Sequence, residues 1–183
     1  MKKQKRQLII IICILVLCVG GYLGAKNIPK EEDIEVGTEN HTVTSINQDE
    51  VTEISYLYEG EIIEIIKEED VFKYKADKSL ALDQSVISNM LSYVCSIDTD
   101  TVIENPESLA EYGLTNPKNT ICLTLADGRV VQLLIGDYLD ITGEYYILLA
   151  GDAKVYTVSS YIPASFEKSV DDLIEAAKKT AEE

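Results

Sequence analysis

Few side chains in this chain of 183 residues have the types and spacing that nucleophilic or metal chemistry requires. A serine or cysteine nucleophile needs a neighbouring imidazole to accept its proton. The one histidine, His41, lies in a polar stretch distant in sequence from Cys95 and Cys122. The same shortage disfavours a zinc site built from His and Cys. We therefore expect a protein that is not an enzyme, with no catalytic residues and no cofactor.

Carboxylates are the abundant chemical group. The chain has 32 Asp and Glu residues against 16 Lys and Arg, a net charge of −16. One loop, DYLDITGE, brings Asp137, Asp140 and Glu144 close together in sequence. Hard cations such as Ca²⁺ prefer several oxygen ligands on a flexible loop, so these three residues are the weak metal candidates. Their spacing is not that of an EF-hand, and the simpler interpretation is a polar connection between strands.

The acidic excess also limits the choice of partner. A strongly negative surface repels nucleic acid and anionic lipid headgroups. We therefore expect no nucleic-acid partner.

The N-terminal segment has the pattern of a membrane anchor. Residues 7–25 contain no charge, and a helix of this length spans about 28 Å, close to the thickness of a bilayer. The basic residues in 1–6 precede it, and every acidic residue follows it. Because flanking basic residues stay in the cytoplasm, we expect a cytoplasmic stub at 1–6, a transmembrane helix at 7–25 and an extracytoplasmic remainder.

Two alternatives for this segment stay open. A cleaved signal peptide has the same basic start and apolar run, and Val19-Gly20-Gly21 would serve as a cleavage site. Lipidation at Cys13 or Cys18 is the other alternative, although the large residues Ile12 and Leu17 stand where a lipobox has a small one.

The rest of the chain divides into a polar tether and a folded domain. Residues 26–49 are acidic and lack an apolar period, which predicts a flexible tether, and the domain is expected at 50–183. Period-two alternation predicts strands at Val51–Tyr58, Ile62–Lys67, Val71–Ala76, Thr120–Leu125, Arg129–Ile135, Tyr145–Ala150 and Lys154–Ser159. Helices are expected after an N-cap at Asp83 and from Ala164 to Lys179.

This order of elements predicts an α+β fold. Strands followed by a helix occur twice, so a duplicated β-β-β-α unit is one interpretation. It would give two small antiparallel sheets, each backed by a helix, with the option of joining edge to edge.

Cysteine and tyrosine residues raise two further questions. Cys95 and Cys122 look like small buried hydrophobes, and a disulfide between them stays open. Tyrosine is plentiful, and adjacent Tyr145 and Tyr146 must face opposite sides of a strand, which favours an exposed tyrosine suited to an interface.

The second half resembles a bacterial family, the domain of unknown function (DUF) 4340 family. The resemblance rests on Tyr112, Gly113, Leu114, Pro117, Asp127, Gly128, Gly136, Asp137, Tyr146 and Tyr156. It implies a membrane-anchored envelope protein without established catalytic residues, some of whose relatives accompany ABC-type transport systems. We interpret the motif as structural: Gly113 and Gly136 would supply backbone angles forbidden to other residues, and Tyr112 would pack its ring inward.

The sequence thus favours a single-pass cell-membrane protein with its N-terminus in the cytoplasm. Its extracytoplasmic domain would bind or brace an envelope partner, with an ABC-type transporter as a candidate. The alternative function is an extracytoplasmic sensor of a ligand or cation.

Overall fold

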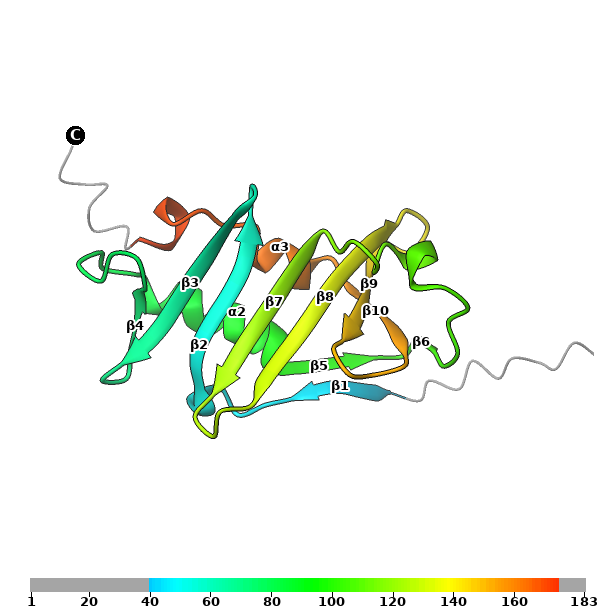
Figure 1. Ribbon diagram of the computed structural model, residues 1–183, viewed down its shortest axis with the longest axis horizontal. Coiled ribbons are helices and arrows are strands. Elements are labelled where there is room, and N and C mark those ends of the chain that lie inside the picture. Colours follow the sequence, from blue (N-terminus) through cyan, green and yellow to red (C-terminus); the bar gives the residue numbers. More distant parts are fainter. Residues whose placement is uncertain (1–39, 175–183) are drawn as a thin grey trace, which may run out of the picture. The chain divides into compact units, whose positions relative to one another are not determined.

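Strands dominate the part of the chain that the computed structural model describes, residues 40–174 (Figure 1). One antiparallel sheet has eight strands in the order β4-β3-β2-β7-β8-β9-β10-β6. Their bounds are β2 Val51–Tyr58, β3 Glu61–Glu68, β4 Val71–Tyr74, β6 Val102–Ile103, β7 Asn119–Leu125, β8 Val130–Leu139, β9 Glu144–Leu149 and β10 Val155–Ser159. A second, two-stranded sheet pairs β1 (His41–Ser45) with β5 (Ser96–Thr99).

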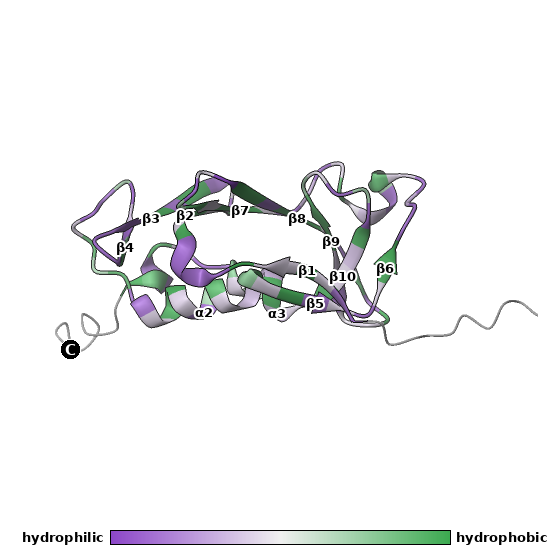
Figure 2. Ribbon diagram, turned by 90° about the horizontal axis from the view of Figure 1, so that it is seen from below, coloured by the Kyte–Doolittle hydropathy of each residue, from purple (hydrophilic) through white to green (hydrophobic). Residues whose placement is uncertain are grey.

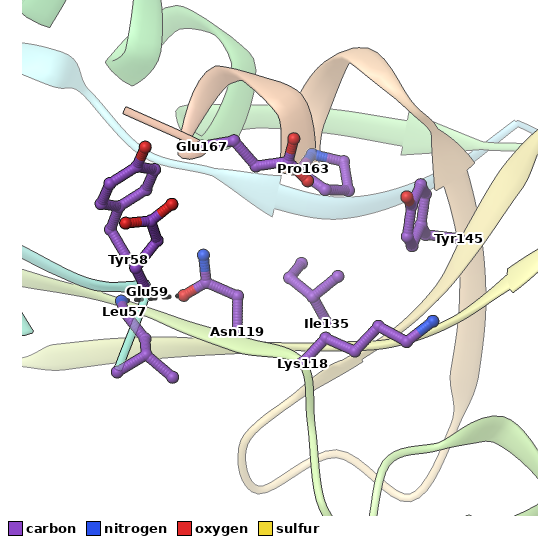
Figure 3. A pocket seen from close by; sticks show the side chains of 9 residues that line it. All are labelled: Leu57, Tyr58, Glu59, Lys118, Asn119, Ile135, Tyr145, Pro163 and Glu167. Atoms are coloured by element: carbon purple, nitrogen blue, oxygen red, sulfur yellow. Dashed lines mark hydrogen bonds between the residues drawn. The ribbon is translucent and has the colours of Figure 1, made fainter. Parts of the chain in front are cut away.

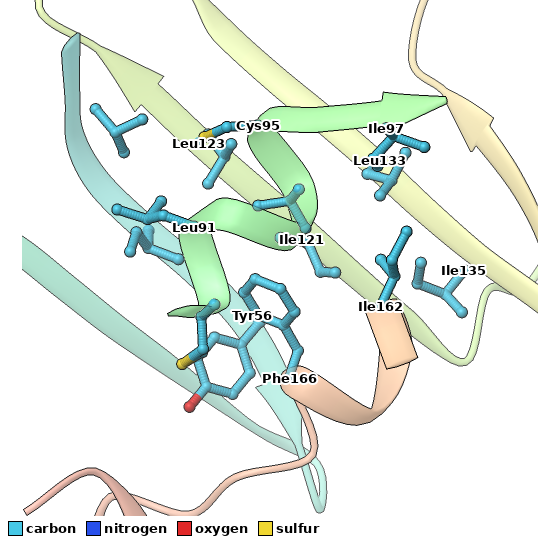
Figure 4. Packing of buried hydrophobic residues seen from close by; sticks show 14 of the residues in the cluster. Tyr56, Leu91, Cys95, Ile97, Ile121, Leu123, Leu133, Ile135, Ile162 and Phe166 are labelled. Carbon is cyan, nitrogen blue, oxygen red and sulfur yellow. The ribbon is translucent and has the colours of Figure 1, made fainter. Parts of the chain in front are cut away.

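Helices and the small sheet lie on one face of the large sheet (Figure 2). The helices on this face are α2 (Gln84–Cys95) and α3 (Tyr161–Ser165), and short 3-10 helices form at Gln48–Glu50, Leu109–Tyr112 and Asp171–Leu173, of which Leu109–Tyr112 belongs to the opposite face. The main core fills the space between the layers, with Tyr56, Ile121, Ile135 and Phe166 almost fully buried (Figure 4). This is the expected α+β class with two layers.

The central pairing of the large sheet joins the two halves of the chain. Strand β2 pairs antiparallel with β7, with Ile54 opposite Leu123 and Ser55 opposite Cys122. Of the two arrangements expected from sequence, the strands adopt the edge-to-edge one, and they form one continuous sheet.

Helix α2 begins where the sequence indicated. The Asp83 carboxylate accepts hydrogen bonds from the backbone N–H groups of Ser85 and Val86. The Ser85 hydroxyl donates to the same carboxylate. This hydrogen bond is the largest of the effects that lower the pKa of Asp83. The buried side chains of α2 include Ile87, Met90, Leu91 and Val94, at the three- and four-residue spacing of an amphipathic helix.

The N-terminal part of the fold starts earlier than expected. The folded unit begins at Asn40, and β1 occupies residues assigned from sequence to a tether at 26–49. Val43 and Thr44 are buried there, and the Thr44 hydroxyl donates to the Val94 carbonyl at 2.7 Å. The other residues of the predicted tether, the predicted transmembrane helix at 7–25 and the stub at 1–6 lie outside the described residues. Between residues 40 and 174 the structure contains no helix with both the length and the apolar character needed to cross a bilayer.

The predicted helix from Ala164 to Lys179 is wrong over the residues that the structure describes. Helix α3 ends at Ser165, and Asp171–Leu173 forms a separate 3-10 turn. Tertiary contacts explain the break: the Tyr56 hydroxyl donates to the Lys168 carbonyl at 3.0 Å, and the Asp83 N–H donates to the Leu173 carbonyl at 2.7 Å. These contacts use carbonyls that a continuous helix would have bonded internally. Both Phe166 and Leu173 remain fully buried.

A side chain protects the exposed edge of the sheet. The Phe72 N–H on edge strand β4 donates to Gln84 Oε1 at 2.9 Å, and Gln84 Nε2 donates to the Phe72 carbonyl at 3.0 Å. The Gln84 amide thus forms the two hydrogen bonds that a neighbouring strand would otherwise form with the Phe72 backbone. Because unpaired strand edges promote aggregation, Gln84 acts here as an edge guard.

Replacing this residue provides a test of the edge guard. Gln84→Ala should lower the free energy of unfolding by about 1–3 kcal/mol, since the two hydrogen bonds to Phe72 and a third to the Leu82 carbonyl are lost. The near-isosteric Gln84→Glu keeps the acceptor but places a carboxylate oxygen against the carbonyls of Phe72 and Leu82, so it should lower stability at least as much as Gln84→Ala. Urea unfolding measures the stability, and hydrogen exchange at the Phe72 amide measures the local effect. Unchanged protection of that amide in Gln84→Ala would contradict the role assigned to Gln84.

Candidate functional site

A groove of about 440 Å³ lies where β2 ends and β7 begins, on the side of α3 (Figure 3). Its walls come from β2, the turn after it, the start of β7, strands β8 and β9, and α3 with the segment that follows. The lining residues are Leu57, Tyr58, Glu59, Lys118, Asn119, Ile135, Tyr145, Pro163 and Glu167. We call this set the acidic groove.

Asn119 fixes one wall of the acidic groove. Its Oδ1 accepts a hydrogen bond from the Leu57 N–H at 2.9 Å, beyond the point where β2 and β7 share backbone pairs. The side chain therefore extends the ladder by one bond and holds the end of β2 in place. Its amide nitrogen points into the open space of the groove (Figure 3).

The turn after β2 places a carboxylate at the rim. Glu59 and Gly60 both have positive φ, 49° and 87°, as a tight two-residue hairpin turn requires. Positive φ is unfavourable for glutamate and suits Gly, Asn or Asp better. Glu59 thus occupies a strained position at the edge of the groove.

Negative charge gathers around Tyr58. A neighbouring hollow of about 360 Å³ shares Tyr58 and Glu59 with the groove and adds Glu61 and Asp171. Within residues 40–174, none of Glu59, Glu61, Glu167 and Asp171 takes part in a salt bridge. The charge of Glu59 raises the pKa of Tyr58, with smaller contributions from burial and from Asp172 and Glu167.

One cation lies at the opposite end of the groove. Lys118 forms a salt bridge with Asp137, with Nζ and Oδ1 3.2 Å apart, and both side chains are more than half exposed. Its backbone N–H donates to the Ile135 carbonyl at 2.8 Å, so the start of β7 is held against β8. The groove therefore has an acidic end near Tyr58 and a neutralised end near Lys118.

The three metal candidates are not assembled into a site. Asp137 lies in β8 and pairs with Lys118, Asp140 is exposed in the following turn, and Glu144 begins β9 opposite Leu139. Among the described residues, no group of three or more His, Cys, Asp or Glu side chains could hold a metal ion.

Several motif residues meet at one joint on the outer face of the sheet. Leu114, Leu148 and Val155 form a second buried cluster, with Tyr112 and Tyr146 packed against it. The rings of Tyr112 and Tyr146 meet edge to face, with centroids 4.9 Å apart. Tyr112 therefore packs its ring inward, as expected, and the joint covers one end of the outer face.

Two glycines allow this joint to close. Gly113 has φ of +69° and ends the 3-10 helix Leu109–Tyr112, and a Cβ on it would lie 2.6 Å from Asp137 Cγ. Gly136 was expected to need an unusual backbone angle, but its φ is not positive. Its requirement is proximity, because a Cβ there would lie 2.1 Å from the Tyr112 carbonyl oxygen.

The other motif residues shape turns and one hydrogen bond. Asp127 accepts from the backbone N–H of Arg129 at the hairpin where Gly128 has φ of +86°. The Tyr156 hydroxyl donates to Asp152 at 2.5 Å, and burial, followed by this bond, raises the pKa of Tyr156 to about 12. Pro117 lies directly before Lys118 and the start of β7. These contacts are structural.

The two cysteines among the described residues, Cys95 and Cys122, are free thiols. Cys95 is buried in the main core, and burial raises the pKa of its thiol to about 11. Cys122 alternates with Ile121 and Leu123, which are in the core, so it points to the opposite face of the sheet. The sheet therefore separates the two sulfur atoms.

The sequence pointed to tyrosines but missed most of the groove. Tyr145 and Tyr146 do face opposite sides: Tyr145 lines the groove and Tyr146 packs on Tyr112, and neither is fully exposed. Glu59, Asn119 and Glu167 come from three separate elements, and nothing local in sequence groups them. An acidic residue in a predicted hairpin turn was the only sequence signal, and Glu69 and Asp70 share it without lining the groove.

Comparison with known proteins gives one match. A family model described as "Domain of unknown function (DUF4340)" matches residues 73–179, from β4 onward. Searches of curated proteins and of solved structures return no significant match.

The joint on the outer face yields a prediction for stability. Gly136→Ala should lower the free energy of unfolding by about 2–3 kcal/mol, since the added methyl group must displace a backbone carbonyl. Gly128→Asn is the control, because nothing lies within 4 Å of that position and Asn tolerates positive φ; it should change stability by less than about 0.5 kcal/mol. Chemical denaturation measures both, and equal effects would contradict the close-approach explanation.

Proposed function

The chain belongs to the DUF4340 family, and from that premise we propose that it is a membrane-anchored extracytoplasmic protein that binds a basic segment of another envelope protein. The domain holds this partner and does not transform it. The acidic groove is the binding site.

The uncompensated carboxylates of the groove carry this proposal. Outside the groove, salt bridges neutralise local acids at Lys67, Lys73, Lys75, Lys78, Arg129 and Lys154, and inside it Lys118 pairs with Asp137 at the far end. Glu59, Glu61, Glu167 and Asp171 surround Tyr58 without such a salt bridge among the described residues. A Lys or Arg side chain entering beside Tyr58 would meet several carboxylates and the face of an aromatic ring.

The size and lining of the groove suit a peptide segment. The groove has a volume of about 440 Å³ and the adjoining hollow a volume of about 360 Å³, and the two share Tyr58 and Glu59. Leu57, Ile135 and Pro163 offer apolar contact between the charged ends, and the Asn119 amide can donate a hydrogen bond. Mixed apolar and polar lining of this kind favours binding of a segment in a defined orientation.

The composition of the groove supports a non-catalytic role. His41, the one histidine, lies in β1 and does not line the groove, and neither Cys95 nor Cys122 does. Carboxylates and a paired lysine can attract and orient a cationic ligand. Acid–base chemistry would require a group whose pKa is tuned towards the working pH.

The membrane placement rests on the N-terminal sequence. The basic residues of 1–6, the uncharged run of 7–25 and the acidic remainder predict an uncleaved signal anchor with the N-terminus in the cytoplasm. An acidic domain is repelled by anionic headgroups, so it would stand clear of the bilayer. Among envelope proteins, a component of an ABC-type transport system is our preferred partner, by analogy with the family.

Protease accessibility tests the topology. In spheroplasts, added protease should degrade a C-terminal epitope on the full-length chain, while an N-terminal epitope survives. The same tagged chain in detergent-lysed cells, where both epitopes should be lost, is the control. A protected C-terminal epitope in spheroplasts, or release of the full-length chain without detergent, would contradict the topology.

Glu59→Asn separates binding from stability at the groove. Asn tolerates positive φ better than Glu does, so this variant should be more stable by about 0.5–1 kcal/mol in urea unfolding. Glu69→Asn is the matched control, because Glu69 has φ of 50° in the next hairpin and lies outside the groove. Both variants should gain stability, and only Glu59→Asn should lose partner binding.

Photo-crosslinking in intact cells measures that binding. A photoreactive residue replaces Ser169, which lines the adjoining hollow. It is introduced into the otherwise unchanged chain, into Glu59→Asn alone and combined with Glu167→Gln, and into Glu69→Asn. We expect one membrane-protein adduct whose crosslinked peptide contains Lys or Arg. It should weaken roughly tenfold in the double variant and persist in Glu69→Asn. An adduct unaffected by loss of both carboxylates, or a crosslinked peptide without basic residues, would refute the proposal.

A further inference from the structure

A second concave surface lies on the other side of α3. A cleft of about 320 Å³ runs between α2 and α3, lined by Val86, Met90, Tyr93, Tyr161 and Ala164 among others. Pro163 and Glu167 face the acidic groove, whereas Ala164 and Lys168 line this cleft, so α3 separates the two. We call the second surface the helical cleft.

The helical cleft is almost free of charge in a strongly acidic protein. No charged residue occurs in residues 84–96, which include all of α2, or in residues 155–166, which include all of α3. Lys168 is the one charged residue that residues 40–174 contribute to the lining. The exposed positions of α2 carry hydroxyl, amide and phenol groups instead, for example Ser88, Asn89 and Tyr93.

Large apolar surface is exposed beside the cleft. Tyr161 is 73% exposed and Tyr93 is 45% exposed, although each carries a large ring. Depletion of charge together with exposed tyrosine is typical of the centre of protein interfaces. The same face thus offers both a projecting ring and a cleft, and an isologous contact requires both on one surface.

The charge distribution indicates the identity of the partner. A basic partner would gain attraction from any acidic face of this protein and would not need an uncharged one. A face without charge is required when the partner is itself acidic, because like charges brought together without counter-charges are destabilising. A second copy of this chain, with its net charge of −16, is such a partner.

We infer that two copies of this protein associate through the helical cleft, with Tyr161 of each copy inserting beside α2 of the other. The inference does not depend on the acidic groove having a ligand. The salt dependence of the two contacts is opposite. Added salt screens the repulsion between the acidic domains and should strengthen self-association, whereas it should weaken capture of a basic segment.

Sedimentation equilibrium of the full-length chain in density-matched detergent tests the inference. We expect a two-chain mass that appears across a micromolar concentration series and is favoured by added salt. Asn89→Glu places one carboxylate in the lining of the cleft and should weaken association at least about tenfold.

Val130→Glu is the matched control. It adds the same charge at an exposed apolar position of β8, a strand outside the lining of the cleft, and it should leave the two-chain mass unchanged. Urea unfolding confirms that both variants are folded. A one-chain mass at all concentrations, a dimer insensitive to Asn89→Glu, or equal loss in both variants would overturn the inference. The second of these results would instead indicate association through another part of the chain.

Discussion

The pairing of β2 with β7 is the interaction on which the rest of the architecture depends. It joins two groups of strands that are separated in sequence by α2 and a long connection, and it does so in the middle of the sheet. One continuous inner face results, and α2, α3 and the small β1–β5 sheet can cover it together. Without this pairing each group of strands would have two exposed edges and only part of a core.

The same pairing creates the candidate site. Because β2 runs antiparallel to β7, the end of one strand lies beside the start of the other, and Tyr58 comes next to Asn119. The short α3 and the segment after it then close the space, because Phe166 packs against Tyr56 in the core. The centroids of the two rings lie 5.4 Å apart. The acidic groove is therefore a consequence of where the central ladder ends and of how the C-terminal segment covers it.

The distribution of charge gives the two concave surfaces different uses. The groove keeps several carboxylates without a neutralising partner among the described residues, while the same part of the chain places no carboxylate in the lining of the helical cleft. A cationic ligand and an acidic protein need surfaces of different kinds. Exposed negative charge attracts the cation, whereas two acidic proteins can approach closely only through surfaces without charge. An acidic domain can in this way bind a basic segment and a second copy at separate places.

The sequence by itself determined the local elements. Alternation located β2, β7, β8 and β10, Asp83 indicated the start of α2, and Asp127-Gly128 indicated the hairpin, because strand period, capping and turn chemistry are properties of neighbouring residues. The motif around Tyr112 and Gly136 also indicated structural roles. The predicted second helix failed beyond Ser165 because buried Phe166 and Leu173 outweighed helix propensity.

Only the tertiary structure decided that Glu59, Asn119 and Glu167 share one groove, that Gly136 is required by a carbonyl from a separate segment, and that Cys95 and Cys122 lie on opposite faces of the sheet. Each of these depends on contacts between residues far apart in the chain, which local patterns do not encode.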